Sequence, residues 1–215
     1  LRGLRSRKPI GFRQWVVHMK IEMRLIMKFE SIKKVLTGKF IHRYDITYRV
    51  SDGSQKVYEM ISRNPNIQTH EELQGKKPDA VVIIMHDKKN EKILLNREFR
   101  LATGAWVYNF PAGLIDQGEE PQQSAARELR EETGLTLDRV CDIIPMSYSA
   151  IGFSNETNVC VVGIASGAFH QSTSAVEEIE ARWYTKEEVR QLIATQPFAA
   201  RTQAYCYLWS RHDNA

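Results

Sequence analysis

Runs of hydrophobic residues, and positions where hydrophobic and polar residues alternate, predict strands over much of the first half of the chain. Residues 39–50 and 55–62 have a strand-like pattern and flank Asp52-Gly53, a pair typical of tight hairpin turns. Residues 80–85 are all hydrophobic, which is typical of a buried strand, and a polar turn separates them from a predicted strand over 92–99. We therefore expect a hairpin followed by the strands of a larger sheet.

The second half of the chain mixes helices with strands. Hydrophobic spacing predicts a helix over 121–132, and Gly134 follows at the position of a C-cap glycine. Thr185 and Glu188 form a capping-box pair that opens a helix ending near 195. Further short strands are predicted around 106–110, 159–164 and 181–184, and a last helix over 201–211. This mixture places the chain in the α/β or α+β class.

Loop-like segments divide the chain into three parts. The segments 64–66 and 75–79 contain Pro, Gly, Asn and Lys, and they separate a small β lobe from the remainder. We expect a basic N-terminal extension over 1–31, an antiparallel β lobe over 32–78 and a main domain over 79–215.

Composition restricts the class of protein. Of the 215 residues, 42% are hydrophobic and 26% are charged, as in an average globular protein. No apolar run approaches the roughly 18–20 residues that a membrane span needs, so we expect no membrane partner. Cys141, Cys160 and Cys206 form no CxxC pair, which argues against a disulfide framework and a zinc site and favours the reducing cytoplasm.

Positive charge is concentrated at the start of the chain. The net charge is +4, yet residues 1–39 contain eleven Lys or Arg and only two Glu. Such a segment can attract nucleic acid or anionic lipid. Because no nucleic-acid-binding motif accompanies the charge, we expect a solvated extension and no nucleic-acid partner.

Three glutamates of the helix predicted over 121–132 carry the candidate chemistry. Glu128, Glu131 and Glu132 are spaced i, i+3 and i+4, so their carboxylates share one helix face and repel one another. Arg127 alone does not neutralise three of them. Hard divalent cations such as Mg²⁺ bind carboxylate oxygens, polarise phosphoryl oxygens and activate water. The pattern indicates metal-assisted phosphorus chemistry, with a charged surface helix as the alternative.

The complete spacing around these glutamates is more informative than the glutamates alone. The fixed positions are Gly113, Glu119, Arg127, Glu128, Leu129, Glu131, Glu132, Gly134 and Leu135. They match the Nudix box throughout, so the sequence resembles the Nudix hydrolases, most strongly over 80–195. The resemblance implies an α/β/α sandwich with a mixed sheet, preceded here by the small antiparallel β lobe.

The resemblance also implies a reaction and a metal site. Nudix hydrolases cleave a nucleoside diphosphate linked to another moiety, using Mg²⁺ or Mn²⁺ and water. On this sequence the metal ligands are expected to be Glu128, Glu131, Glu132 and the backbone carbonyl of Ala112. Glu131 and Glu132 are also counted among the catalytic residues, and Glu132 is expected to be the central metal ligand.

Other residues are assigned supporting roles by the same resemblance. Arg127 is expected to orient the glutamates and balance their charge, with Glu119 supporting that network. Gly113 is expected to let the backbone come close to the phosphates of the substrate. The general base is expected on a loop after the box, where Glu177 and Glu178 are the candidates and Glu156 is the alternative.

The flanks of the box resemble one subgroup, the ADP-ribose and nucleotide-sugar pyrophosphatases. The resemblance lies in Arg97-Glu98-Phe99-Arg100 and in the segment 110–119. It implies hydrolysis of ADP-ribose or a related nucleoside diphosphate sugar to a nucleoside monophosphate and a sugar phosphate. It also implies a homodimer whose β lobes help to form the substrate site. Arg97 and Arg100 are the expected substrate contacts.

The sequence departs from this subgroup at two positions. Asn109 stands where the subgroup commonly has an acid before its Phe-Pro-Ala-Gly segment, and Ile151 stands where a proline is common. Other nucleoside diphosphate sugars, dinucleoside polyphosphates, modified nucleotides and capped RNA therefore stay open as substrates. A non-catalytic nucleotide-sugar sensor is the remaining alternative.

Overall fold

A three-stranded antiparallel sheet forms the N-terminal lobe of the computed structural model, which describes residues 27–174 and 177–212. The strands are β1 (Met27–Thr37), β2 (His42–Val50) and β3 (Gln55–Ser62), paired in that order. Gly53 has φ 87° in the turn between β2 and β3, as the Asp-Gly pair predicts.

The lobe has a small hydrophobic core of its own. Tyr44, Ile46, Met60 and Ile67 are buried in it, and the short 3₁₀ helix η1 (Glu71–Leu73) contributes Leu73 to its edge. Because β1 already begins at Met27, the boundary predicted between 31 and 32 lies inside this strand; the rest of the predicted extension lies outside the described residues.

A mixed sheet forms the centre of the main domain. The strand order is β10-β5-β4-β9-β8, with β6 paired to β5 and β7 paired to β4. Strand β4 runs parallel to β9 and antiparallel to β7, so the sheet is mixed. The strands are β4 (Ala80–His86), β5 (Lys92–Arg100), β6 (Ala105–Asn109), β7 (Ala112–Leu114), β8 (Thr136–Tyr148), β9 (Thr157–Ser166) and β10 (Ile179–Thr185).

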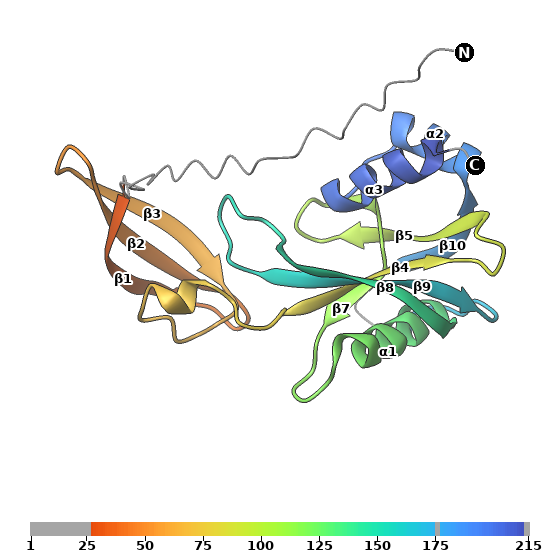
Figure 1. The fold of residues 1–215 in the computed structure, drawn as a ribbon, viewed down its shortest axis with the longest axis horizontal. Coiled ribbons are helices and arrows are strands. Elements are labelled where there is room, and N and C mark those ends of the chain that lie inside the picture. The colour runs from red at the N-terminus through yellow and green to blue at the C-terminus, as the bar shows by residue number, and fades with distance from the viewer. Residues whose placement is uncertain (1–26, 175–176, 213–215) are drawn as a thin grey trace, which may run out of the picture.

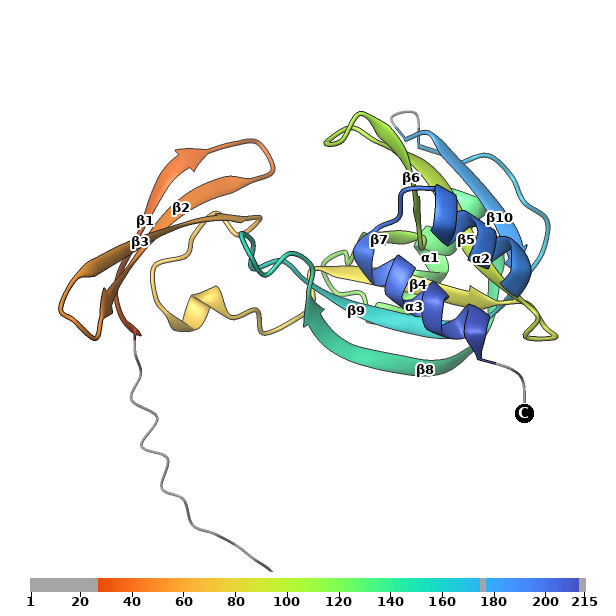
Figure 2. The ribbon, with the colours of Figure 1, turned by 90° about the horizontal axis from the view of Figure 1, so that it is seen from above.

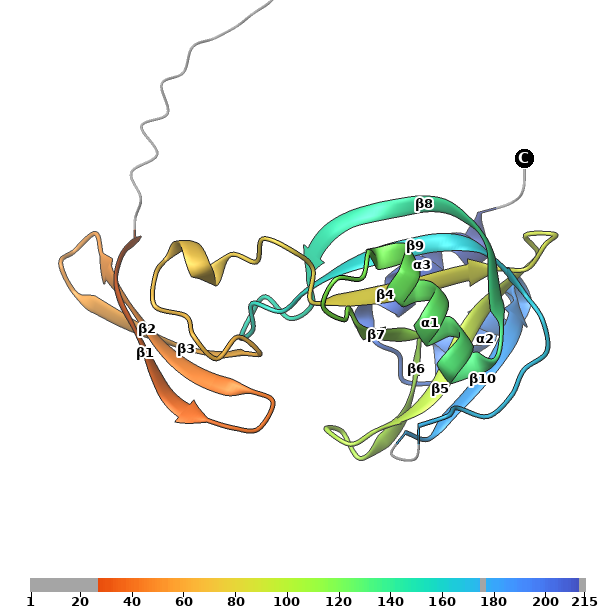
Figure 3. The same cartoon turned by 90° about the horizontal axis from the view of Figure 1, so that it is seen from below.

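Helices cover both faces of this sheet. Helix α1 (Pro121–Thr133) lies on one face, and α2 (Lys186–Thr195) and α3 (Ala200–Arg211) lie on the other (Figure 1). Figure 2 shows the sheet from the side of α2 and α3, and Figure 3 from the side of α1. The predicted α/β/α sandwich is confirmed. Within the described residues, no helix has the length and apolar composition needed to cross a membrane.

The alternation of β4 explains why both faces are covered. Val81, Ile83 and Met85 pack toward α1, whereas Val82 and Ile84 pack toward α2 and α3. A strand that is hydrophobic at successive positions must be buried on both sides, because successive side chains point to opposite faces. The continuous apolar run of this strand therefore requires a helix layer on each face.

Helix α1 begins and ends at the predicted signals. Pro121 is its first residue, and Glu120 and Gln123 form a reciprocal capping box at its start. It ends at Gly134, which has φ 84°. A Cβ on Gly134 would lie 2.8 Å from the carbonyl oxygen of Ala168, so the chain approaches too closely here for a side chain.

Strands β4 and β5 separate along their length. Their register contains one pair, His86 with Ile93, at the far end of β4. Beyond it, β7 pairs with β4 and β6 pairs with β5, so the segment between Asn109 and Ala112 runs through the gap. This separation opens the sheet to both helix layers at one place, and the candidate site lies there.

The loop between β8 and β9 joins the lobe to the main domain. The Ile61 amide donates a hydrogen bond to the carbonyl oxygen of Phe153 at 2.9 Å, and the Tyr58 hydroxyl donates to the carbonyl oxygen of Gly152. Arg63 forms an ion pair with Glu156, with 2.6 Å between Nε and Oε1. Hydrogen bonds and an ion pair thus connect the lobe to the main domain.

A buried histidine makes the stability of the main domain depend on pH. His86 lies 3.1 Å from the Tyr205 hydroxyl through Nε2, and its ring packs 5.7 Å from the Trp209 ring. Burial lowers the pKa of His86. Just below about pH 6.5, His86 is therefore protonated in the unfolded chain but still neutral in the folded one. Its contribution to the free energy of unfolding is complete above about pH 6.5 and is lost as the pH falls below that value.

We expect the free energy of unfolding, measured by urea denaturation, to fall between pH 7.5 and 5.5 at no more than about 1.4 kcal/mol per pH unit from this one proton. His86→Gln keeps a polar group facing Tyr205 but does not titrate, so its curve should be flatter over this range. Equal slopes for the two proteins would assign the pH dependence to other groups.

Candidate active site

A cavity of about 530 Å³ opens where β4 and β5 separate. Helix α1 contributes Glu128 and Glu132, and the short strand β7 contributes the backbone of Ala112 and Gly113. The lining is completed by Arg63, Ala80, Val82, Arg100, Asn109, Leu114, Ser149, Glu156, Asn158, Glu177 and Arg201. Acidic and basic side chains therefore face a single space.

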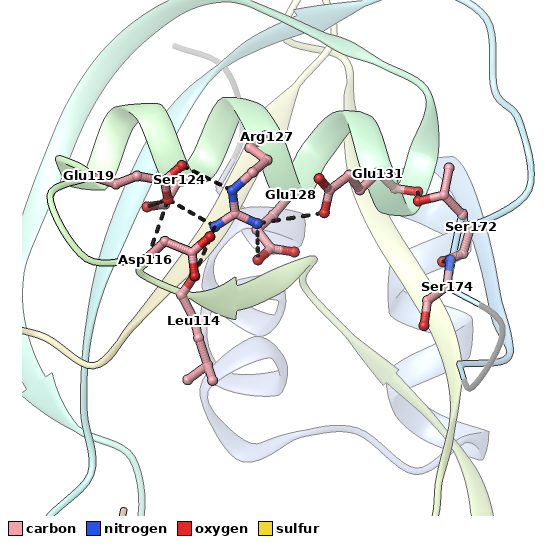
Figure 4. Close-up of polar contacts among 10 residues, drawn as sticks. Leu114, Asp116, Glu119, Ser124, Arg127, Glu128, Glu131, Ser172 and Ser174 are labelled. Carbon is pink, nitrogen blue, oxygen red and sulfur yellow. Dashed lines mark hydrogen bonds and ion pairs between the residues drawn. The ribbon is translucent and has the colours of Figure 1, made fainter. Parts of the chain in front are cut away.

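Arg127 holds the start of the acidic helix face together (Figure 4). Its Nε and Nη2 donate to the two carboxylate oxygens of Glu119 at 3.0 and 2.9 Å. Its Nη1 donates to Glu128 at 2.7 Å, and Nη2 also donates to the carbonyl oxygen of Leu114 at 3.0 Å. One guanidinium thus ties the box loop to α1.

The electrostatics of this network keep Glu119 ionised. Hydrogen bonds from Arg127 and then Ser124 lower the pKa of Glu119 to about 2. The same Glu119 contact raises the pKa of Arg127 further above its usual range. A bidentate Arg–carboxylate pair of this kind fixes geometry as well as charge.

The Glu128 carboxylate packs directly against Gly113. A Cβ built on Gly113 would lie 1.9 Å from Cδ of Glu128 and 2.0 Å from Oε1. No side chain fits there unless Glu128 moves. The glycine of the box is therefore a packing requirement of this carboxylate, set by the pairing of Gly113 with Val81.

The Glu132 carboxylate is fixed by a hydrogen bond from strand β5. Asn96 of β5 is fully buried and donates a hydrogen bond from Nδ2 to Oε2 of Glu132 at 2.7 Å. Glu132 itself is 7% exposed. Burial, followed by the charges of Glu98 and Glu128, raises the pKa of Glu132 well above its usual range.

The carboxylate of Glu98 lies next to Asn109, the residue that stands where the subgroup commonly has an acidic side chain. Asn109 donates from Nδ2 to Oε1 of Glu98 at 2.9 Å, and Arg100 lies 3.5 Å from the same oxygen. Burial raises the pKa of Glu98 as well. The carboxylate that the sequence lacks at 109 is thus present one strand away, on β5.

The donors of this cavity fit a hard divalent cation. Burial also raises the pKa of Glu128, so Glu98, Glu128 and Glu132 repel one another in a poorly hydrated place, and a cation would offset that cost. Among the described residues, no three acidic, His or Cys groups are close enough to form a complete metal site. The Ala112 carbonyl, substrate phosphates and water would complete it, as Mg²⁺ usually retains waters.

The structure brings most of the sequence-predicted residues to this cavity. Besides Glu128 and Glu132 of α1, the cavity is lined by Ala112, Gly113, Arg100, Glu156 and Glu177. Glu177 is exposed and has both Glu128 and Glu132 within electrostatic reach.

Other predicted residues lie elsewhere. The Arg97 guanidinium stacks 4.4 Å from the Trp106 ring centre and bonds to Glu180 at 2.9 Å, outside the cavity. Glu131 has a side chain that is 49% exposed and lies 3.6 Å from Arg127 (Figure 4). Glu178 is also outside the cavity lining, and its carbonyl oxygen accepts from the amide of Phe99 at 3.0 Å. Their predicted roles stay predictions.

Reasoning from the sequence missed two residues that contact the cavity lining, Asn96 and Glu98, and two that belong to it, Arg63 and Arg201. Asn96 and Glu98 occupy alternate positions directly after the apolar run 93–95 of β5, which was a usable signal for polar groups on one face of the strand. Arg63 and Arg201 come from β3's end and from α3, far away along the chain, and no local pattern marks them.

Comparison with known proteins assigns the family. The model of the NUDIX domain matches residues 76–206. The chain belongs to the Nudix family. A solved structure of an ADP compounds hydrolase is similar to this Nudix chain, with a TM-score of 0.64, 18% identity and coverage of 85% of this chain and 91% of its own. At that identity the likeness shows the fold alone.

Relatives of this Nudix protein include two named pyrophosphatases. The ADP-sugar pyrophosphatase of Mus musculus is 31% identical over 140 residues, covering 64% of this chain and 61% of its own length. The ADP-ribose pyrophosphatase of Saccharomyces cerevisiae is 29% identical over 147 residues, covering 67% and 61%. The match therefore spans about three-fifths of the length of these relatives.

Proposed function

We propose that this Nudix protein is a Mg²⁺-dependent hydrolase of ADP-ribose or a related nucleoside diphosphate sugar, releasing a nucleoside monophosphate and a sugar phosphate. The supporting observation is the cavity in which Glu128, Glu132 and the Ala112 backbone face Arg63, Arg100 and Arg201. Acidic groups there suit a cation, and the arginines suit phosphate oxygens. The names of the relatives support the same substrate class.

Residues of this chain carry the individual tasks. When bound, Mg²⁺ neutralises diphosphate charge and acidifies a water. Glu128 and Glu132, held by Arg127 and Asn96, would bind it. Glu177 faces the cavity as the candidate that accepts the proton of the attacking water.

A substrate panel tests this function. The purified chain would be incubated with ADP-ribose, ADP- and UDP-hexoses, dinucleoside polyphosphates and NAD-capped RNA, each with Mg²⁺, Mn²⁺ or EDTA. We expect a nucleoside monophosphate and a sugar phosphate from nucleotide sugars, only in the presence of a metal, by chromatography. Hydrolysis of only the dinucleoside polyphosphates or the capped RNA would contradict the proposed nucleotide-sugar substrate. Tight binding of a nucleotide sugar without hydrolysis would favour a non-catalytic sensor.

Gly113→Ala tests the packing of Glu128. Since the new Cβ would overlap the Glu128 carboxylate, we expect that side chain to shift and turnover to fall by roughly 10²-fold, as for a misplacement of about 1 Å. Gly152→Ala is the matched control, because nothing lies within 4 Å of a Cβ there. Steady-state kinetics of both variants provide the measurement; wild-type turnover in Gly113→Ala would show that Glu128 needs no fixed position.

We also propose a homodimer. Large hydrophobic side chains are exposed on the lobe, including Leu36 at 63% and Phe40 at 66%, and on the loop after β8, including Ile151 at 75%. Light scattering coupled to size-exclusion chromatography should give twice the chain mass. A monomer at micromolar concentration would contradict this. The cytoplasmic location stays a prediction.

A further inference from the structure

Among the residues that the structure describes, one arginine of the cavity has no carboxylate partner in an ion pair. Arg63 is paired with Glu156 at 2.6 Å, and Arg100 lies 3.5 Å from Glu98. Arg201 also lines the cavity, but none of the ion pairs found among residues 27–174 and 177–212 includes it. The three arginines of the cavity therefore differ in what neutralises them.

The Arg201 side chain is also short of a hydrogen-bond acceptor. Its Nε is buried and has no partner within the described part of the chain. Arg201 is within electrostatic reach of the Cys160 thiol, whose pKa is raised by burial and lowered in part by Arg201. A neutral thiol does not balance a guanidinium. A buried N–H without an acceptor is costly, and a bound anion would remove that cost.

The first turn of α3 is fixed to the cavity wall. The Thr202 hydroxyl donates to Oδ1 of Asn109 at 2.8 Å and accepts from the amide of Phe110 at 3.2 Å. Just before the helix, the amide of Ala199 donates to the carbonyl oxygen of Tyr108 at 2.9 Å. Arg201 stands between these two anchors, so its backbone is positioned before any ligand arrives.

The two sides of the cavity have opposite charge and come from opposite layers. Glu128 and Glu132 belong to α1, which covers one face of the sheet, whereas Arg201 belongs to α3 on the other face (Figures 2 and 3). They share a cavity because β4 and β5 separate at this point. A ligand that fits this cavity therefore carries negative charge, which Arg201 can bind, and can share a cation with Glu128 and Glu132.

We propose that Arg201 binds anionic oxygens of the diphosphate of the substrate, as a residue that selects for phosphorylated ligands. This inference rests on the proposed function for the identity of the ligand. The planar fork of a guanidinium matches two oxygens of one phosphoryl group, which an amide or an ammonium does not reproduce. The cation on the α1 side and Arg201 on the α3 side would then neutralise different oxygens.

Binding of probe anions tests the proposal without hydrolysis. Inorganic pyrophosphate, AMP and uncharged adenosine would be titrated into the wild type, Arg201→Gln and Arg201→Lys by calorimetry, with Ca²⁺ replacing Mg²⁺. We expect Arg201→Gln to weaken pyrophosphate and AMP binding by about 10- to 100-fold, as for a hydrogen bond to a charged group, and to leave adenosine unchanged. Arg201→Lys should recover only part of the affinity.

Arg211→Gln is the matched control. Arg211 ends the same helix, is exposed, and its guanidinium lies 3.8 Å from the Tyr207 ring centre, outside the cavity. This variant should bind all three probes like the wild type, and thermal denaturation should show that all variants fold. Equal pyrophosphate affinity in wild type and Arg201→Gln would overturn the proposal, as would a wild type that binds neither phosphorylated probe.

The substrate panel separates this inference from the proposed function. Hydrolysis of nucleotide sugars together with unchanged pyrophosphate binding in Arg201→Gln would refute the role of Arg201 alone. Loss of phosphate binding in Arg201→Gln, with no nucleotide sugar hydrolysed by the wild type, would refute the substrate class and support the anion site.

Discussion

Glu132→Gln should lower turnover of a nucleotide sugar by about 10³-fold or more, because it removes the most buried carboxylate of the cavity that we propose binds the cation. The protein should still fold. Asn96 can donate to the amide oxygen of the new side chain as it donates to Glu132, and one like charge disappears from among Glu98 and Glu128. We expect a free energy of unfolding equal to or above that of the wild type.

Two comparisons make this prediction specific. Glu131→Gln should reduce turnover less, since the Glu131 side chain is 49% exposed and lies outside the cavity. Glu187→Gln, on the surface of α2, provides the control for the substitution itself. Calorimetric titration with Mn²⁺ should show weaker cation binding in Glu132→Gln. Full turnover in Glu132→Gln would remove the basis of the site assignment.

Arg127→Met should lower the free energy of unfolding by about 1–3 kcal/mol, the cost of leaving a partly buried polar group without its hydrogen-bond partner. Methionine keeps much of the length of the side chain but removes the guanidinium hydrogen bonds to Glu119, Glu128 and the Leu114 carbonyl. Turnover should fall as well, because the Glu128 carboxylate is no longer fixed from this side.

Arg130→Met is the control for Arg127→Met. Arg130 lies on the same helix and is exposed, so its removal should change stability by less than about 0.5 kcal/mol. Urea denaturation of both variants at pH 7.5 provides the measurement. Equal midpoints for the two variants would mean that the network around Arg127 contributes nothing to folding.

The box residues could be predicted because they belong to one continuous segment. Residues 113–135 form a strand end, a loop and a helix, and the helical period alone brings Glu128 and Glu132 to one face. Arg97 and Arg100, by contrast, are three positions apart on one strand, so they point to opposite faces. Strand alternation therefore allows only one of the two to line the cavity, and it is Arg100.

The long strand β8 was not predicted, for a physical reason. Its hydrophobic residues Ile143, Ile144 and Met146 are exposed, so no alternation of buried and exposed positions marks it, and Pro145 interrupts it. The proline is accommodated at a shift of register between Ile144 and Ser147. Antiparallel pairing with the next strand, β9, defines this strand more than its own pattern does.

The ion pair between Arg63 and Glu156 has a consequence for how the molecule responds to its ligand. The pair joins the lobe to the main domain, and both side chains also line the cavity. An anion that attracts Arg63 must compete with Glu156 and so weaken that junction. By reciprocity, a change elsewhere that strengthens or weakens this junction must alter the affinity of the cavity for that anion.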